Sequence, residues 1–226
     1  MRLEELNWMD VESYLAEEDR IILVLGATEQ HGYLSLLTDV KIPLALSDAA
    51  SASTGVLVAP PLNFGVSPYF ATYPGTISLR TSTFLAAVED IVRSLYGVGF
   101  RRIFIMNGHG GNSGVRTRLT ELANEMDGLK FIWYSWWESH SIEAIAMKHE
   151  LKTAHANWME AFPFTRVANL PADAKIPPKV IGVPNAEETR ALYGDGMFGG
   201  AYLASGEIMD EVFAAALTDV LEFIQF

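Results

Sequence analysis

The chain has 226 residues, half of them hydrophobic, a length and composition that predict one domain with a substantial core. It contains no cysteine, which excludes disulfides, thiolate metal sites and cysteine nucleophiles, so any metal ion must be bound by histidine and carboxylate side chains. The net charge of -12 disfavours nucleic acid and anionic membranes as partners, and it favours a small neutral or cationic substrate or a metal ion.

Apolar runs bounded by turn residues alternate with amphipathic stretches, which is typical of a parallel sheet covered by helices on both faces. Buried strands are predicted at residues 21–26, 54–59, 102–106 and 129–134. Helices are predicted at residues 10–17, 82–96, 112–126 and 207–226. Residues 171–184 contain four prolines and few periodic apolar positions, which indicates an irregular loop or lid.

The N-terminal segment and the short apolar runs indicate where in the cell the protein is expected. Residues 1–10 have neither the basic start nor the apolar core of a signal peptide. The densest apolar stretches, such as residues 21–25, are too short to span a bilayer. We therefore expect a cytoplasmic protein with no membrane partner.

Polar side chains of the ligand type follow two of the predicted strands. The first strand is followed by Ala27-Thr-Glu-Gln-His-Gly and then by Thr38-Asp39, and the third by Asn107-Gly-His-Gly-Gly-Asn. In an open α/β sheet, ligands collect beyond the carboxyl ends of the strands. Both segments are therefore expected to face one crevice.

These segments contain the side chains of a hydrolytic metal centre. Glu29 and His31 lie two positions apart, so on an extended segment they point to the same side and can reach one ion or two adjacent ions. Asp39 lies a short loop away and could bridge two ions, and His109 would supply another nitrogen. Histidine and carboxylate without thiolate suit zinc, manganese or iron, and we favour one or two zinc ions per chain.

Taken alone, each segment also has a structural explanation. A Glu-x-His pair in a loop is usually solvated surface. Residues 107–112 could form a flexible turn with Asn112 as a helix N-cap, or a turn whose amides bind an anion. The two segments together are more specific than either one.

The combined pattern resembles the creatininase (creatinine amidohydrolase) family, whose hallmark is Glu-Gln-His-Gly, then Thr-Asp, then Asn-Gly-His after a later strand. The same motifs stand here at residues 29–32, 38–39 and 107–109. Residues 73–78, Tyr-Pro-Gly-Thr-Ile-Ser, are similar to the family's Phe-Pro-Gly-Thr-Ile-Ser. Residues 155–160 resemble its His-Ala-Gly-x-x-Glu, and Gly194-Asp-Gly matches a late Gly-Asp element.

The resemblance implies a three-layer α/β/α sandwich with a mostly parallel sheet, commonly assembled into hexamers, so we expect a homo-oligomer. It assigns Glu29, His31, Asp39 and His109 as metal ligands, with Asp39 bridging, and His155 as a proton shuttle. Better known members of the family hydrolyse a cyclic amide or a formamide, and others cleave peptides.

The chain also departs from the family pattern. The loop before Asp39 is one residue shorter than usual and lacks a second histidine, so the wall around the substrate must differ. Creatininase has a glutamate where this chain has Gly111, and we expect Glu160 to supply that carboxylate, or else to support a ligand or bind substrate. The family's Glu-His pair ahead of the Pro-Gly-Thr segment is replaced within Pro68-Tyr-Phe. These departures argue against creatinine as the substrate.

We predict a metal-dependent hydrolase of a cyclic amide, a formamide or a related C–N bond other than a peptide bond. The metal is expected to activate water, His155 to protonate the leaving group, and the backbone amides of Gly110 and Gly111 to bind the oxyanion. Trp136, Trp137 and Trp158 lie near these segments; at least one should be a core or subunit contact, and Trp136 and Trp158 are candidates for the substrate wall.

Two other functions stay open. The same site could cleave a C–C bond in a cyclic ketone or a sugar-derived substrate, because it activates water without dictating which carbonyl is attacked. Alternatively, the shortened loop and Gly111 could belong to a non-catalytic metal-binding protein.

Overall fold

Four parallel strands form the central layer of the structure, a computed structural model that describes residues 1–226. The strands are β1 (Arg20–Leu25), β2 (Leu57–Val58), β3 (Arg102–Asn107) and β4 (Lys130–Ser135), in the spatial order β2-β1-β3-β4. Leu25 pairs with Asn107, and Asn107 pairs with Ser135, so three strands end at the same level. The segments that follow these strands therefore leave the sheet at one edge.

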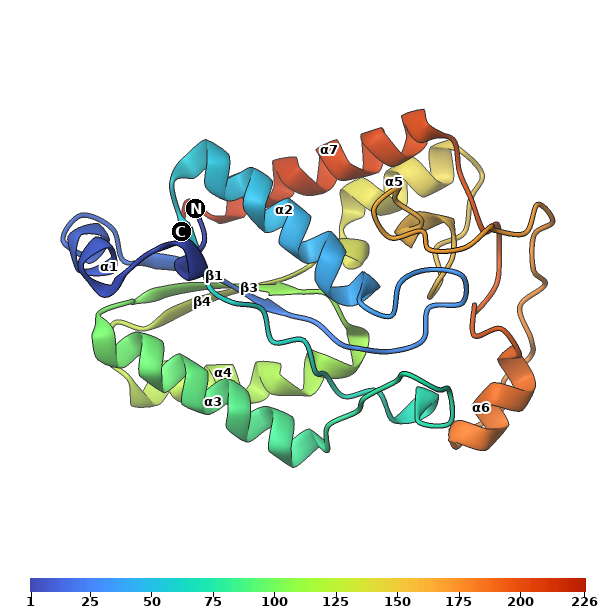
Figure 1. Cartoon of the computed structure of the whole chain (residues 1–226), viewed down its shortest axis with the longest axis horizontal. Coiled ribbons are helices and arrows are strands. Elements are labelled where there is room, and N and C mark those ends of the chain that lie inside the picture. The colour runs from blue at the N-terminus through green and yellow to red at the C-terminus, as the bar shows by residue number, and fades with distance from the viewer.

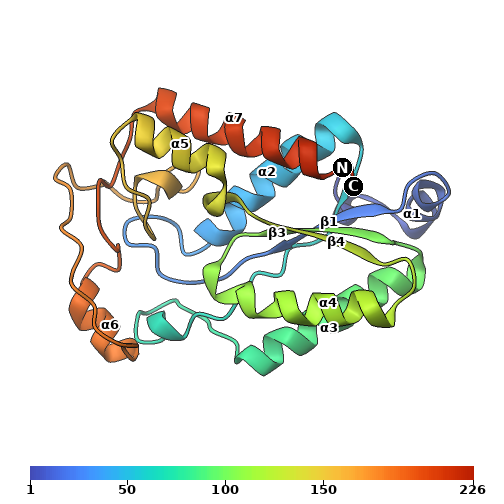
Figure 2. The same ribbon diagram turned by 180° about the vertical axis from the view of Figure 1, so that it is seen from behind.

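Helices cover both faces of this sheet, as Figures 1 and 2 show from opposite sides. One face carries α2 (Thr38–Thr54), α5 (His140–Lys148) and α7 (Gly206–Phe223), and the other carries α3 (Thr81–Val98) and α4 (Val115–Glu125). Side chains of successive strand residues point to opposite faces, so β1 sends Ile22 and Val24 to the first layer and Ile21 and Leu23 to the second. The three-layer α/β fold with a parallel sheet is therefore confirmed.

Two shorter helices lie outside these layers. Helix α1 (Trp8–Leu15) lies near the end where both chain termini are found, and α6 (Ala186–Tyr193) lies beyond the opposite end of the sheet (Figure 1). No helix is both long enough and apolar enough to cross a membrane.

Helix α2 is the main element that the sequence did not predict, together with α5 and α6. It has Pro43 in its interior and many small residues, so its apolar positions give no clear helical period. It is held by packing against the sheet and α7, because tertiary contacts override weak local preference. The strand predicted at 54–59 is shorter than expected, since α2 runs to Thr54 and only Leu57–Val58 pairs with β1.

The start of the helix predicted at 112–126 also needs correction. Residues Gly110–Gly114 form a 3-10 turn, and α4 begins only at Val115. Asn112 is not a helix N-cap: its Oδ1 accepts from the Val66 N–H at 3.3 Å, and its Nδ2 donates to the Gly26 carbonyl at 3.1 Å. It ties together the segments that follow β1, β2 and β3.

Two glycines allow α2 to begin directly against the strand ends. A Cβ atom on Gly108 would lie 1.9 Å from the Asp39 carbonyl oxygen, and one on Gly26 would lie 2.7 Å from the same atom. Both distances are far below van der Waals contact, so no larger residue fits without moving the helix. This close approach places the first turn of α2, and with it Asp39, at the carboxyl ends of β1 and β3.

Candidate metal centre

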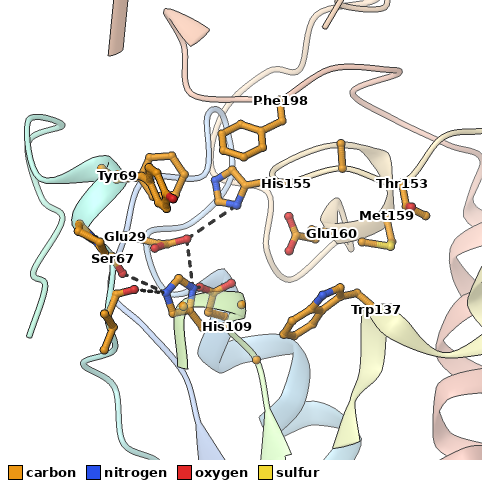
Figure 3. Close-up of a pocket in the computed structure, with 18 residues that line it drawn as sticks. Glu29, Ser67, Tyr69, His109, Trp137, Thr153, His155, Met159, Glu160 and Phe198 are labelled. Carbon is orange, nitrogen blue, oxygen red and sulfur yellow. Dashed lines mark hydrogen bonds and ion pairs between the residues drawn. The ribbon is translucent and has the colours of Figure 1, made fainter. Parts of the chain in front are cut away.

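All five side chains that the sequence predicts as metal ligands meet at this edge of the sheet. Figure 3 labels three of them, Glu29, His109 and Glu160. Glu29 and His31 come from the loop after β1, Asp39 from the first turn of α2, and His109 from the segment after β3. Glu160 ends the 3-10 turn Trp158–Glu160. All five are buried.

The five side chains form two groups that share Asp39; a third group, Glu29, His31 and His155, does not contain it and is less buried. Glu29, Asp39 and His109 make one group, and His31, Asp39 and Glu160 make the other, with ligand atoms within 4.8 Å of one another in each. Asp39 Oδ1 lies 2.9 Å from His31 Nε2, and its Oδ2 lies 2.9 Å from His109 Nδ1. Each carboxylate oxygen therefore serves a different group, the arrangement of a bridging ligand between two adjacent ions.

The second nitrogen of each histidine is fixed by the backbone. His31 Nδ1 lies 3.2 Å from the Glu29 carbonyl oxygen, and His109 Nε2 lies 2.9 Å from that of Val66. A carbonyl oxygen only accepts, so these nitrogens donate, and His31 Nε2 and His109 Nδ1 face the carboxylates. A histidine oriented by a carbonyl in this way is typical of metal ligands.

The cluster leaves buried polar atoms without hydrogen-bond partners. These atoms are Glu29 Oε2, His31 Nε2 and Asp39 Oδ2. The last two lie within ion-pair distance of a neighbour, but their direction does not suit a hydrogen bond. Buried polar atoms are rarely left unpaired, so three such atoms within one cluster fit bound cations.

The electrostatics of the cluster lead to the same conclusion. Burial, the largest single influence on His31, lowers its pKa, but Asp39, Glu160 and Glu29 together raise that pKa to about 10. The pKa of His109 is likewise raised well above its usual value by Glu29 and Asp39, against the effect of burial. The carboxylates thus stabilise positive charge at His31 and His109. Divalent ions bound to the two histidines would supply that charge in place of the two protons.

A hydrogen bond from the nearby backbone orients the Glu160 carboxylate toward this cluster. Its Oε2 accepts a 2.5 Å hydrogen bond from the Ala156 N–H, and its Oε1 lies 3.9 Å from His31 Nε2. Ala156 adopts a left-handed conformation with φ of 60°, which is uncommon for alanine. Burial raises the pKa of Glu160 to about 7.

Position 111, where creatininase has a glutamate, has no room for a side chain in this chain. A Cβ atom there would lie 2.0 Å from the Val66 carbonyl oxygen and 2.5 Å from His109 Nε2. That carbonyl is the one that orients His109, so a side chain at position 111 would displace a candidate ligand. Glu160 places a carboxylate in the second group of candidate ligand atoms.

His155 lies at the edge of the same cluster. Its Nδ1 is 3.8 Å from Glu29 Oε1, and its Nε2 is 3.2 Å from the Gln30 carbonyl oxygen. Its ring stacks on Phe70 with centroids 4.7 Å apart. Burial, together with the charge on His31, lowers the pKa of His155 well below its usual value, so the imidazole is neutral near pH 7.

A pocket of about 520 Å³ opens onto the cluster. Gly110 and Gly111 line it as expected, and the aromatic part of its lining consists of Tyr69, Phe70, Trp137 and Phe198. The prediction that Trp136 and Trp158 form the substrate wall is wrong. Both are fully buried in the core beneath α7, at 1% and 0% exposure, and Trp137 lines the pocket in their place.

The Gly-Asp element near residue 195 holds the segment that carries Phe198, one of the rings lining this pocket. Asp195 forms an ion pair with Lys175, and its Oδ2 accepts from the Tyr202 hydroxyl at 2.6 Å. Lys175 Nζ also donates to the Met197 carbonyl at 2.7 Å. The Gly196 carbonyl accepts from Gln30 Nε2 at 3.0 Å. The loop at 171–184 thus fastens the segment that carries Phe198.

Replacing Lys175 with methionine is expected to loosen this segment, because Asp195 loses its cation and two carbonyls lose a donor. We expect the free energy of unfolding to fall by about 1–3 kcal/mol and proteolysis between residues 171 and 200 to accelerate. Urea denaturation and limited proteolysis read by mass spectrometry would measure both. Lys179→Met, on the same loop at an exposed position, is the control, and equal behaviour of the two variants would contradict the fastening role.

Comparisons with known proteins agree with these observations. Residues 4–224 match the family described as "Creatininase: Creatinine amidohydrolase". The creatinine amidohydrolase of Pseudomonas putida is 33% identical over 59% of this chain and 56% of its own length. A mycofactocin precursor peptide peptidase of Mycobacterium tuberculosis is 35% identical over 45% of each chain. A 3-dehydro-scyllo-inosose hydrolase of Thermotoga maritima is 27% identical over 47% of this chain and 35% of its own.

These alignments span about half the length of the first two curated relatives. Solved structures are similar over more of the chain. One titled "Creatininase Mn" has a TM-score of 0.79 at 27% identity, covering 99% of this chain and 97% of that one. A creatininase variant of "Zn-Zn type" has a TM-score of 0.77 at 26% identity, covering 99% and 96%.

Proposed function

The chain belongs to the creatininase family, and we propose that it hydrolyses a C–N bond of a small-molecule amide with one or two divalent metal ions. One observation carries the proposal: Asp39 directs one oxygen to each of two buried histidines, each histidine lying within a group of three candidate ligands. This arrangement opens onto a pocket of small-molecule size.

Glu29, Asp39 and His109 would hold one ion, and His31, Asp39 and Glu160 the other. Such ions supply Lewis acidity, which makes water nucleophilic near neutral pH and polarises a carbonyl. Zinc and manganese are both compatible with this donor set, and both are named in similar creatininase structures. We propose zinc first and manganese second.

The chain's own groups complete the chemistry. His155 is largely buried, faces Glu29 and borders the pocket, so it can move a proton from the water side to the departing nitrogen. Gly110 and Gly111 bring backbone close to the same space, where amide N–H groups could stabilise an oxyanion.

A substrate panel would test the proposal. Protein loaded with zinc or manganese, and the same protein after chelation, would be incubated with lactams, formamides and cyclic ureas, and release of amine would be followed. Metal-dependent amine release supports the proposal. Products of C–C cleavage from cyclic ketones would favour the second candidate chemistry, and metal binding without any turnover would favour the non-catalytic one.

Replacing His155 with asparagine is expected to lower kcat by about 10²–10⁴-fold while leaving the metal content unchanged, because the imidazole moves a proton and is not one of the proposed ligands. Steady-state kinetics and plasma mass spectrometry on the same samples would measure this. His149→Asn is the control, since His149 pairs with Glu211 at the end of α5, away from the pocket. Unchanged turnover would show that another group donates the proton.

We also propose that the chain forms a homo-oligomer, with a hexamer as the family's common assembly. Ile176, Ile181 and Val183 on the 171–184 loop are 87%, 84% and 83% exposed, which is unusual for aliphatic side chains clustered on one loop. Sedimentation equilibrium should give a mass several times the 24.9 kDa of one chain, and Ile181→Lys should weaken the assembly. A monomer at all concentrations would contradict this proposal.

A further inference from the structure

The part of the pocket that lies away from the candidate ligands is aromatic and lacks positive charge. Its lining includes Tyr69, Phe70, Trp137 and Phe198, and no lysine or arginine is among the lining residues. Figure 3 shows Tyr69 and Phe198 on one side of the carboxylates and Trp137 on the other. A substrate whose carbonyl meets the cluster would therefore place its remainder among these rings.

Three of these rings, Phe70, Phe198 and Trp137, are held in place by packing against other rings. Phe70 is 5% exposed and stacks on His155, and its ring centroid lies 5.7 Å from that of Phe198. Phe198 in turn stacks on Tyr193 with centroids 4.1 Å apart. Trp137 packs edge-on against the buried Trp136 at 6.2 Å. The pocket thus has a preformed aromatic wall, which reduces the ordering cost of binding a flat group.

Charge excludes one large class of substituent from this wall. The charged side chains in the pocket are the carboxylates of Glu29, Asp39 and Glu160, which belong to the proposed ligand groups. The lining has no lysine or arginine that could pair with a substrate carboxylate. A carboxylate on the distal part of a substrate would lose its water and meet rings and neutral side chains such as Met159 and Thr153. Burying an unpaired charge is costly, so such substrates should be rejected.

The sequence at this wall also has fewer ionisable groups than the family pattern. The resembled family has a Glu-His pair ahead of its Pro-Gly-Thr segment, and this chain has Pro68-Tyr69-Phe70 there, with two rings and no ionisable pair of that kind. The structure shows where this change acts, because both rings line the pocket and Phe70 covers one face of His155.

We propose, resting on the amide hydrolysis proposed above, that the substrate is an uncharged amide or lactam whose substituent away from the scissile bond is flat and apolar, and that Phe70 and Trp137 select it. Stacking between aromatic rings adds to the effect of area burial. Together with rejection of charge, it should give a preference of roughly tenfold or more for an aryl-substituted amide over a carboxylate-substituted one.

Binding of two matched lactams to the zinc-loaded protein would test this. A phenyl-substituted pyrrolidinone and pyroglutamate share the lactam and differ in the phenyl or carboxylate group, and calorimetry measures their affinity without requiring turnover. We expect the phenyl lactam to bind tighter by roughly tenfold or more. Trp137→Ala should remove most of that preference, Trp137→Phe should retain it, and Tyr69→Arg should strengthen binding of pyroglutamate. Trp8→Ala, at a 70% exposed position outside the pocket, is the control.

The outcomes separate this inference from the proposed function. Equal or tighter binding of pyroglutamate, or no binding of either lactam, would overturn the inference even if other amides are hydrolysed. Selective binding of the phenyl lactam without hydrolysis of any amide would support the inference about the pocket and contradict the proposed chemistry. Metal content measured on each variant shows whether a changed affinity reflects the wall or a lost ion.

Discussion

Replacing Asp39 with alanine is expected to abolish metal binding in both ligand groups, because Asp39 is the one side chain common to them. Its two oxygens lie 2.9 Å from His31 Nε2 and from His109 Nδ1, so a single substitution removes a ligand atom from each group. We expect zinc affinity to fall by more than about 100-fold, since even the loss of a supporting residue costs 10–100-fold. Plasma mass spectrometry after zinc loading, with calorimetric titration, would measure stoichiometry and affinity.

Two variants sharpen this experiment. His109→Ala removes a ligand from one group and should leave one ion in place, whereas Asp39→Ala should leave none. Asp48→Ala is the matched control, because Asp48 lies on the same helix but pairs with Arg2, away from the cluster. Stoichiometric zinc in Asp39→Ala would show that the two groups do not share a bridging ligand, and would remove the observation that carries the proposed function.

The sequence predicted the parts of this site that depend on local spacing. Glu29 and His31 are two residues apart after a strongly apolar strand, so their common direction could be read without a structure. The position of His109 after the neighbouring strand followed from the rule for strand ends, and the structure brings it to 3.4 Å from Glu29. Glu160 came from the family motif, and the contact from the Ala156 N–H that orients it could not be predicted.

The pocket wall could not be predicted, because it depends on packing between distant segments. Trp136 and Trp137 are adjacent in sequence, yet one is buried in the core and the other lines the pocket. The sequence does not say which face of the short turn after β4 points inward. Phe70 and Phe198 come from opposite parts of the chain and meet over His155. Only the altered residues before the Pro-Gly-Thr segment gave a signal, at Tyr69 and Phe70.

Helix α2 shows how a weak local signal can conceal an element essential to the site. The first turn of α2 contains Asp39. Because Pro43 and many small residues lie in this helix, its sequence shows no clear helical period of apolar residues. Its position is marked in the sequence by two glycines, Gly26 and Gly108, one after each central strand. The first turn of α2 packs directly against both. Their role became visible only once the Asp39 carbonyl was seen against them.

Gly108→Ala should therefore damage fold and site together. The added Cβ would lie 1.9 Å from the Asp39 carbonyl oxygen and 2.7 Å from Pro43 Cγ, and both neighbours are rigid, so α2 must shift away from β3. We expect the free energy of unfolding to fall by about 3 kcal/mol and zinc affinity to fall with it, because the shift carries Asp39 out of register with His109. Urea denaturation of the metal-free protein and zinc titration would measure the two effects separately.

Gly110→Ala is the matched control for this change, because a Cβ atom at Gly110 meets nothing within 4 Å. It lies two residues further along the same segment after β3, so a general loss of glycine flexibility would affect both variants alike. If Gly108→Ala keeps full stability and zinc binding, the close approach of α2 to β3 is not what positions Asp39. If stability falls but zinc affinity is retained, the helix moves as a unit with the ligands, and the site is more tolerant of displacement than its buried, orphaned atoms suggest.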